Sequence, residues 1–147
     1  MRTNLSSQIS LNHVSPRYYK PENAVERSVL TRLEKIPTDI FETIEEGVRR
    51  IADEVAAKIQ ERQRERKFCT LAIGTGTSLR PLFTELVRRH KDEGLSFRNV
   101  IVFNLYEFYP LTEGNGSTFG QLNSLFLSQT DIDRQNVFTI DGSIPQN

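Results

Sequence analysis

The chain has 147 residues, enough for one domain with a hydrophobic core, and its 19 acidic residues balance its 19 basic residues. This balance gives no electrostatic reason to expect nucleic acid or a membrane as a partner. No apolar run is long enough to span a bilayer, no signal peptide is recognisable, and a single cysteine excludes an internal disulfide, so we expect a cytoplasmic protein.

Residues 1–37 are predicted to form an N-terminal extension ahead of a main domain at 38–147. The extension begins with a polar arm whose two prolines disfavour helix. A short amphipathic helix is expected over residues 22–35, ended by Pro37. This helix would cover either the main domain or a neighbouring subunit, and the sequence does not decide between them.

A short edge strand at 39–42 and a long amphipathic helix are predicted next. Thr43 and Glu46 form a capping box at the start of this helix. Its last turn is the run 61–67, in which acids alternate with bases, so we interpret it as a solvated helix end rather than a nucleic-acid site. Apolar residues at helical spacing predict one buried stripe: Ile44, Val48, Ile51, Val55 and Ile59.

The centre of the chain reads as strand, glycine loop and helix. Residues 68–73 are an apolar run suited to a buried strand, and residues 79–90 repeat apolar side chains at helical spacing. The loop between them ends at a helix N-terminus, where N–H groups and the helix dipole attract anions. From this loop alone, a phosphate-binding loop and an ordinary turn with Ser78 as N-cap both remain open. Its residues are Gly74, Thr75, Gly76, Thr77 and Ser78.

A second strand is predicted at 99–103, so that two strands joined through a helix form a βαβ unit of a parallel sheet. A loop at 104–116, a helix at 117–129 and a third strand at 137–140 follow. Ligands of such α/β folds bind beyond the carboxyl ends of the strands. The loops after the first two strands are therefore expected to form opposite walls of one cleft, which favours the phosphate interpretation.

Other chemistry-bearing residues are assigned structural roles. Cys69 lies in the first strand and is expected to be a buried, inert thiol. Asp131 and Asp133 precede the third strand and are expected to cap turns. His13 and His90 lack the spacing of metal ligands, so no metal site is predicted.

Several segments in order along the chain resemble glucosamine-6-phosphate deaminases: 71–78, 94–100, 103–108, 131–137 and 141–142. The resemblance implies the α/β, Rossmann-like three-layer fold of the sugar-phosphate isomerases and deaminases, built on a parallel sheet and incomplete in this chain. It also implies an enzyme that isomerises and deaminates a phosphorylated amino sugar or ketose without a cofactor. The extension resembles what precedes the deaminase-like region in long bacterial members, which carry a further deacetylase-like domain.

The resemblance also places the site residues. Thr75, Gly76 and Thr77 match the loop that wraps the sugar phosphate, and together with Gly74 and Ser78 they form our candidate phosphate site. Two further residues are placed in the cleft: Asn104 and Ser117.

The candidate catalytic positions are Tyr106 and Glu107. Members of the family carry an aspartate base where this chain has Tyr106. A phenol has an unperturbed pKa of about 10 and is a poor base near neutral pH. Glu107 matches the family's glutamate and should point away from its neighbour's side of an extended segment.

The family's ring-opening histidine segment would follow Asn147, so about half the catalytic domain is expected to lie outside this sequence. We therefore expect the chain to be inactive alone and to require the remainder of a larger protein or self-association. Three functions stay open for the parent protein: a deaminase-like enzyme, a non-catalytic sugar-phosphate-binding module, and a 6-phosphogluconolactonase-like hydrolase. The last fits less well, because those enzymes usually carry an Asp-Glu-Arg loop.

Overall fold

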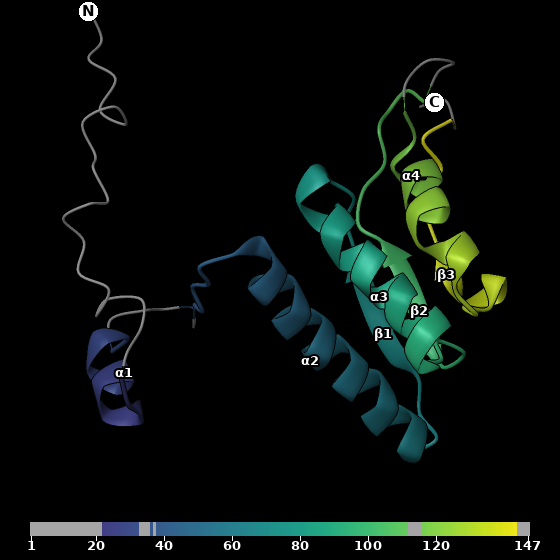
Figure 1. Ribbon diagram of the computed structural model, residues 1–147. Coiled ribbons are helices and arrows are strands. Elements are labelled where there is room, and N and C mark those ends of the chain that lie inside the picture. Colours follow the sequence, from purple (N-terminus) through teal and green to yellow (C-terminus); the bar gives the residue numbers. More distant parts are fainter. Residues whose placement is uncertain (1–21, 33–35, 37, 112–115, 144–147) are drawn as a thin grey trace, which may run out of the picture. The chain divides into compact units, whose positions relative to one another are not determined.

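The computed structural model describes residues 22–32, 36, 38–111 and 116–143 (Figure 1). The predicted N-terminal arm, Pro37 and His13 lie outside the described residues. By its internal contacts the chain divides into two compact units, one up to Ile44 and one from Glu45 onward. Within the described part, no helix combines the length and apolar character needed to cross a membrane.

The first unit contains helix α1 (Ala24–Leu30). Asn23 caps it, because its side-chain oxygen accepts a hydrogen bond from the Glu26 N–H at 2.9 Å. The helix is shorter than the predicted span of 22–35, since Thr31 already forms its C-cap. The predicted strand at 39–42 is wrong: these residues are irregular, and no described strand pairs with them.

The second unit is built on a parallel three-stranded sheet in the order β1-β2-β3 (Figure 1). Its strands are β1 (Cys69–Ile73), β2 (Val100–Asn104) and β3 (Val137–Phe138). β1 and β2 pair along their whole length, with Ile73 opposite Asn104. The predicted parallel βαβ arrangement is confirmed, although β3 ends two residues earlier than expected.

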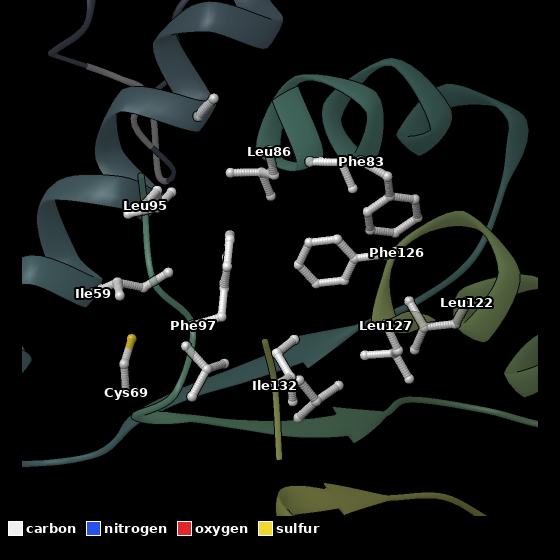
Figure 2. Packing of buried hydrophobic residues seen from close by; sticks show 14 residues of the cluster. Ile59, Cys69, Phe83, Leu86, Leu95, Phe97, Leu122, Phe126, Leu127 and Ile132 are labelled. Carbon is white, nitrogen blue, oxygen red and sulfur yellow. The ribbon is translucent and has the colours of Figure 1, made fainter. Parts of the chain in front are cut away.

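Three α-helices of this unit contribute to one hydrophobic core: α2 (Ile44–Arg64), α3 (Arg80–Glu93) and α4 (Thr118–Leu125). Their apolar side chains pack against one face of the sheet (Figure 2). Three short 3₁₀ turns complete the unit, η4 (Thr77–Leu79), η5 (Leu127–Gln129) and η6 (Arg134–Asn136). The core contains Ala52, Ile59, Cys69, Phe83, Leu86, Val87, Leu95, Phe97, Val100, Val102, Leu122, Phe126, Leu127 and Ile132.

The predicted helix at 117–129 is interrupted at Phe126. The backbone leaves the helical conformation there, with φ −138° and ψ −58°. The fully buried Phe126 ring stacks on Phe83 at a centroid distance of 5.5 Å and meets the edge of Phe97 at 5.4 Å (Figure 2). Aromatic burial therefore outweighs helical continuity at this position.

The buried face of α2 differs from the predicted stripe. Ala52 and Ile59 are fully buried, whereas Ile44 and Ile51 remain exposed. The face turned toward the core thus carries Ala52 and Ile59, with Val55 and Ala56 partly buried beside them. Arg89 of α3 reaches across to Asp53 of α2 at 2.7 Å.

The opposite face of the sheet is open in the described structure. Phe103 and Phe138, which pair in register across β2 and β3, are 44% and 49% exposed. Their rings stack at a centroid distance of 4.9 Å. The described residues therefore form two of the three expected layers, because parallel sheets normally bury both faces.

Candidate functional site

The loops after β1 and β2 start side by side at the carboxyl end of the sheet. The Leu105 N–H donates a hydrogen bond to the Ile73 carbonyl at 3.0 Å, which continues the pairing beyond the two strands. Thr75 lies two positions after Ile73, and Tyr106 lies two positions after its partner Asn104. The predicted adjacency of the two loops is confirmed.

Tyr106 connects the two loops directly. Its hydroxyl donates a hydrogen bond to the backbone carbonyl of Thr75. Its ring lies against Gly74, because a Cβ atom added there would be 3.0 Å from the ring carbon Cε1. A side chain at position 74 would therefore press on the Tyr106 ring, whereas the backbone angles of Gly74 do not themselves call for glycine.

The glycine loop leads into α3 through a 3₁₀ turn. Gly74 and Thr75 are half-buried, whereas the three residues that follow are exposed. The Leu79 N–H donates to the Gly76 carbonyl at 3.1 Å, and α3 begins only at Arg80. Ser78 is therefore not the N-cap of this helix, which corrects the simpler interpretation of the loop. The residue after Arg80 is Pro81, whose fixed φ suits a first helical turn.

Glu107 points in a different direction from Tyr106 and binds the start of α4. Its carboxylate accepts hydrogen bonds from the Ser117 hydroxyl at 2.7 Å, the Thr118 N–H at 2.8 Å and the Phe119 N–H at 3.1 Å. The N–H of Phe108 adds a fourth, at 3.0 Å. Burial opposes the charge of Glu107, but the four donors outweigh it and lower its pKa to about 2.

Asn104 lies buried at the end of β2 and ties the second loop to α4. Its side-chain N–H₂ group donates to the Tyr106 carbonyl at 2.9 Å and to the Thr118 hydroxyl oxygen at 3.0 Å. The Thr118 hydroxyl in turn donates to the Tyr106 carbonyl. The buried Asn104 Oδ1 has no hydrogen-bond partner among the described residues.

Two parts of this arrangement are absent from the sequence-based prediction. Thr118 is buried and joins Asn104 to Tyr106, yet in the sequence it is only one hydroxyl residue of a Ser-Thr pair before a helix. Gly142 lies in a turn after β3, and its carbonyl accepts a hydrogen bond from the Leu111 N–H at 2.8 Å. The segment after β3 thus supports the second loop, a contact that local patterns do not reveal.

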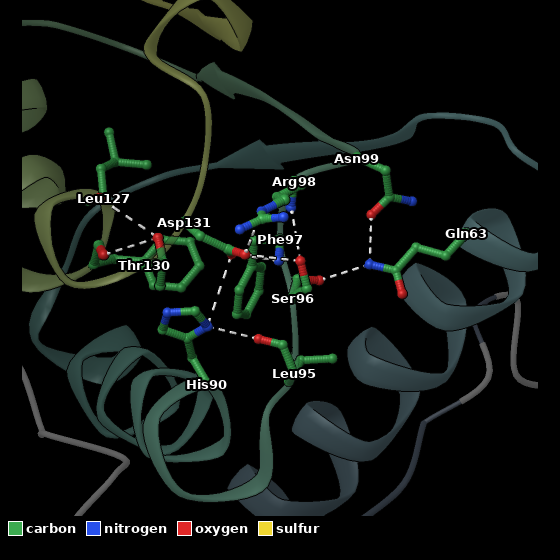
Figure 3. A network of polar contacts seen from close by, with 11 residues as sticks. Gln63, His90, Leu95, Ser96, Phe97, Arg98, Asn99, Leu127, Thr130 and Asp131 are labelled. Carbon is green, nitrogen blue, oxygen red and sulfur yellow. Dashed lines mark hydrogen bonds and ion pairs between the residues drawn. The ribbon is translucent and has the colours of Figure 1, made fainter.

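A second polar network lies near the start of β2, away from this site (Figure 3). Asp131 accepts hydrogen bonds from the Phe97 N–H at 2.6 Å and the Ser96 hydroxyl at 2.8 Å. Burial opposes the charge, yet these hydrogen bonds lower the pKa of Asp131. Asp133 caps η6 through the Gln135 N–H at 2.9 Å. The predicted capping role is confirmed for Asp133, whereas Asp131 binds the segment before β2, more than 30 positions earlier in the chain.

The remaining single residues also have structural positions. Cys69 is buried in the core as predicted, and burial raises the pKa of its thiol. The Nδ1 atom of His90 lies 2.7 Å from the Leu95 carbonyl oxygen. Within the described ranges, histidine, cysteine and acidic residues form no group of three that could hold a metal ion.

Comparison with known proteins identifies relatives of this chain. The sequence profile of the family described as glucosamine-6-phosphate isomerases/6-phosphogluconolactonase matches residues 42–147. A glucosamine-6-phosphate deaminase-like protein of Bacteroides thetaiotaomicron is 59% identical over 148 residues, covering all of this chain and 22% of that protein. The glucosamine-6-phosphate deaminase of Bacillus velezensis is 33% identical over 93 residues, covering 63% of this chain and 39% of its own.

Solved structures agree with the fold. A monomeric glucosamine-6-phosphate deaminase matches with a TM-score of 0.65 and 26% identity, over 72% of this chain and 43% of its own. The 6-phosphogluconolactonase of Thermotoga maritima matches with a TM-score of 0.55 and 19% identity, over 67% of this chain and 43% of its own. The second likeness shows the fold alone.

The chain thus spans less than half the length of each relative named here. The predicted resemblance and the partial α/β fold are confirmed. Because the family profile covers residues 42–147, the chain belongs to the glucosamine-6-phosphate isomerase/6-phosphogluconolactonase family.

Proposed function

We propose that this chain supplies the phosphate-binding part of a sugar-phosphate site in a glucosamine-6-phosphate deaminase-like protein. The observation that carries the proposal is the glycine loop at 74–78, which lies before α3 and beside the second loop. In the complete protein this site would bind a phosphorylated amino sugar for isomerisation and deamination, and it would also bind the ketose phosphate that remains after ammonia is released. The main domain at 38–147 would then be the N-terminal half of the catalytic domain.

The chemistry of the loop suits a phosphate group. Thr77 and Ser78 are exposed and carry hydroxyl donors, and Gly76 leaves its backbone open to a ligand. The first N–H groups of a helix have no partner within the helix and carry partial positive charge. Arg80 stands exposed in the first turn of α3 and adds a cation close to the loop.

The same geometry favours binding without turnover by this chain. Glu107 is held by three hydrogen bonds from the start of α4 and one from Phe108, and its low pKa leaves it with little tendency to accept a proton. The Tyr106 hydroxyl donates a hydrogen bond to the backbone carbonyl of Thr75. Neither candidate catalytic position therefore offers a free base, and we expect no deaminase activity from the chain alone.

A non-catalytic sugar-phosphate-binding module is the second candidate for the complete protein, and the Tyr106 contact favours it. Ammonia release from glucosamine 6-phosphate, measured with a protein extended to the length of its relatives, would decide between the deaminase and the binding module. No release from the protein with Tyr106, and release after Tyr106→Asp, would support the binding module. Ammonia release at an ordinary enzymatic rate with Tyr106 in place would exclude it, and hydrolysis of 6-phosphogluconolactone would instead identify a lactonase.

The open face of the sheet bears on the partners of the chain. Phe103 and Phe138 leave an aromatic surface exposed, which parallel sheets normally cover. We propose that the remainder of a longer protein, or a second copy of the chain, covers this surface in the cytoplasm.

Isothermal titration calorimetry of the chain tests the binding site. Glucosamine 6-phosphate and fructose 6-phosphate should bind, whereas glucosamine, which lacks the phosphate, should give no measurable heat. Thr77→Val should weaken the binding roughly fivefold, the effect of one lost hydrogen bond of about 1 kcal/mol. Thr70→Val, which changes an exposed threonine of β1, is the matched control. Equal heats for glucosamine and its phosphate, or no heat for either, would contradict the proposal.

A further inference from the structure

We propose that Tyr106 is a positioning residue that holds the glycine loop in place from the second loop. The inference depends on the proposed function only for the ligand that the loop binds. The contact itself is a property of the free protein and can be tested without any ligand.

Two contacts of different chemistry join Tyr106 to the glycine loop. The edge of its ring lies on Gly74, where even a methyl group would come within 3.0 Å of the ring carbon Cε1. Its hydroxyl donates a hydrogen bond to the carbonyl of Thr75. The ring therefore limits movement toward the second loop, while the hydrogen bond limits movement away from it.

The Tyr106 backbone is attached to a rigid frame. Its carbonyl accepts hydrogen bonds from the buried side chains of Asn104 and Thr118. The next residue, Glu107, is bound to the first turn of α4. Residues 76–78 of the glycine loop are exposed, whereas the backbone around Tyr106 is held by buried side chains. We therefore infer that Tyr106 orders the glycine loop.

This contact also decides what the phenol can do chemically. The Tyr106 hydroxyl is directed at the Thr75 carbonyl and is occupied by that hydrogen bond. Tyr106 should therefore affect how tightly a phosphate ligand binds, because it organises the loop in advance.

Nuclear magnetic resonance of the ligand-free chain tests the contact through Tyr106→Phe, which keeps the ring and removes the hydroxyl. We expect the carbonyl carbon of Thr75 to shift upfield, and the backbone order parameters at 74–76 to fall from about 0.85 toward 0.6. Thr70→Val, which removes a hydroxyl from an exposed position of β1, should leave both readouts unchanged. An unchanged Thr75 carbonyl and unchanged order parameters in Tyr106→Phe would overturn the proposal.

A second pair of variants tests the ring contact. Gly74→Ala should displace the ring and alter the Thr75 carbonyl signal in the same direction, whereas in the Tyr106→Ala background it should have little further effect. Equal effects of Gly74→Ala in both backgrounds would contradict the ring contact.

Ligand binding separates this inference from the proposed function. If glucosamine 6-phosphate binds, Tyr106→Phe should weaken it roughly threefold to tenfold, as expected for the loss of one ordering hydrogen bond. If the unaltered chain binds no phosphorylated sugar, the proposed function fails, while the ligand-free signals still decide the role of Tyr106.

Discussion

The Glu107 carboxylate accepts a hydrogen bond from the Ser117 hydroxyl at 2.7 Å, ten positions further along the chain. Ser117 is also the N-cap of α4, because its oxygen accepts from the Gly120 N–H at 3.0 Å. The hydrogen bond between Glu107 and Ser117 thus fixes both the direction of the second loop and the start of α4. The ionised carboxylate further suits the positive end of the helix dipole.

Acid should weaken the fold through Glu107. Its pKa is lowered from 4.5 to about 2, so its contribution to the free energy of unfolding is present above pH 4.5 and is lost as the pH falls toward 2. Urea unfolding between pH 2 and pH 7 should show Glu107→Gln destabilised by about 2 kcal/mol at pH 7, and the difference should vanish near pH 2. Glu54→Gln, at an exposed site, is the control. A constant difference across this range would contradict the assignment.

Gly142→Ala should disturb the second loop from the far end of the chain. An added Cβ would lie 2.2 Å from the Phe108 carbonyl oxygen and 3.1 Å from Cγ of Glu107. Because backbone must move to make room, we expect a loss of about 1–3 kcal/mol in the free energy of unfolding. Gly120→Ala meets only ordinary contacts within a helix and should be neutral or stabilising by up to about 1 kcal/mol. The same loss in both variants would show that steric contact with the loop is not the cause.

Thr118→Val should show the value of the buried hydrogen bonds behind Tyr106. The substitution keeps the shape of the side chain but leaves one Asn104 N–H without its acceptor. We expect the free energy of unfolding to fall by about 1–3 kcal/mol in urea. Thr139→Val, at an exposed position, should change it by less than about 0.5 kcal/mol. Equal stability of the two variants would mean that the Asn104 contact contributes nothing.

Arg66→Gly should stabilise the chain. Arg66 has a φ of 54°, a left-handed conformation, and follows the end of α2. The Lys67 N–H donates to Arg62 and the Arg66 N–H to Gln63, the two hydrogen bonds of a Schellman motif that usually places glycine here. Relief of strain, less the entropy cost of glycine, should add about 0.5–1 kcal/mol to the free energy of unfolding. Gln60→Gly, at an exposed position inside α2, should lower the free energy of unfolding by a similar amount.

The sequence predicts the elements whose signals are local. β1 and β2 lie within one residue of their expected bounds, and α3 begins within one residue of its expected start but continues three residues further, to Glu93. Apolar runs and helical spacing are strong there. Helix α4 ends early because Phe126 turns into the core, a gain that depends on Phe83 and Phe97 from other elements. No local pattern contains that information.

For the candidate site, the sequence predicts which loops are neighbours but not which of their residues are in contact. The glycine loop and its neighbour follow from the order of strands and loops in a parallel sheet. The contact between Tyr106 and Thr75 depends on the register of β1 against β2, which the sequence does not specify. The same holds for Gly142, whose role requires the segment after β3 to return to the second loop.

A chemical-shift map of the chain, titrated with glucosamine 6-phosphate, tests the central claim most directly. The amide shifts should concentrate at residues 74–78 and extend to the start of the second loop. The comparison region is near the other end of the strands, where the basic residues Arg66, Lys67 and Arg98 contribute to the lining of a pocket of about 280 Å³. Shifts confined to that pocket, or no shifts at 74–78 at millimolar ligand, would contradict the account.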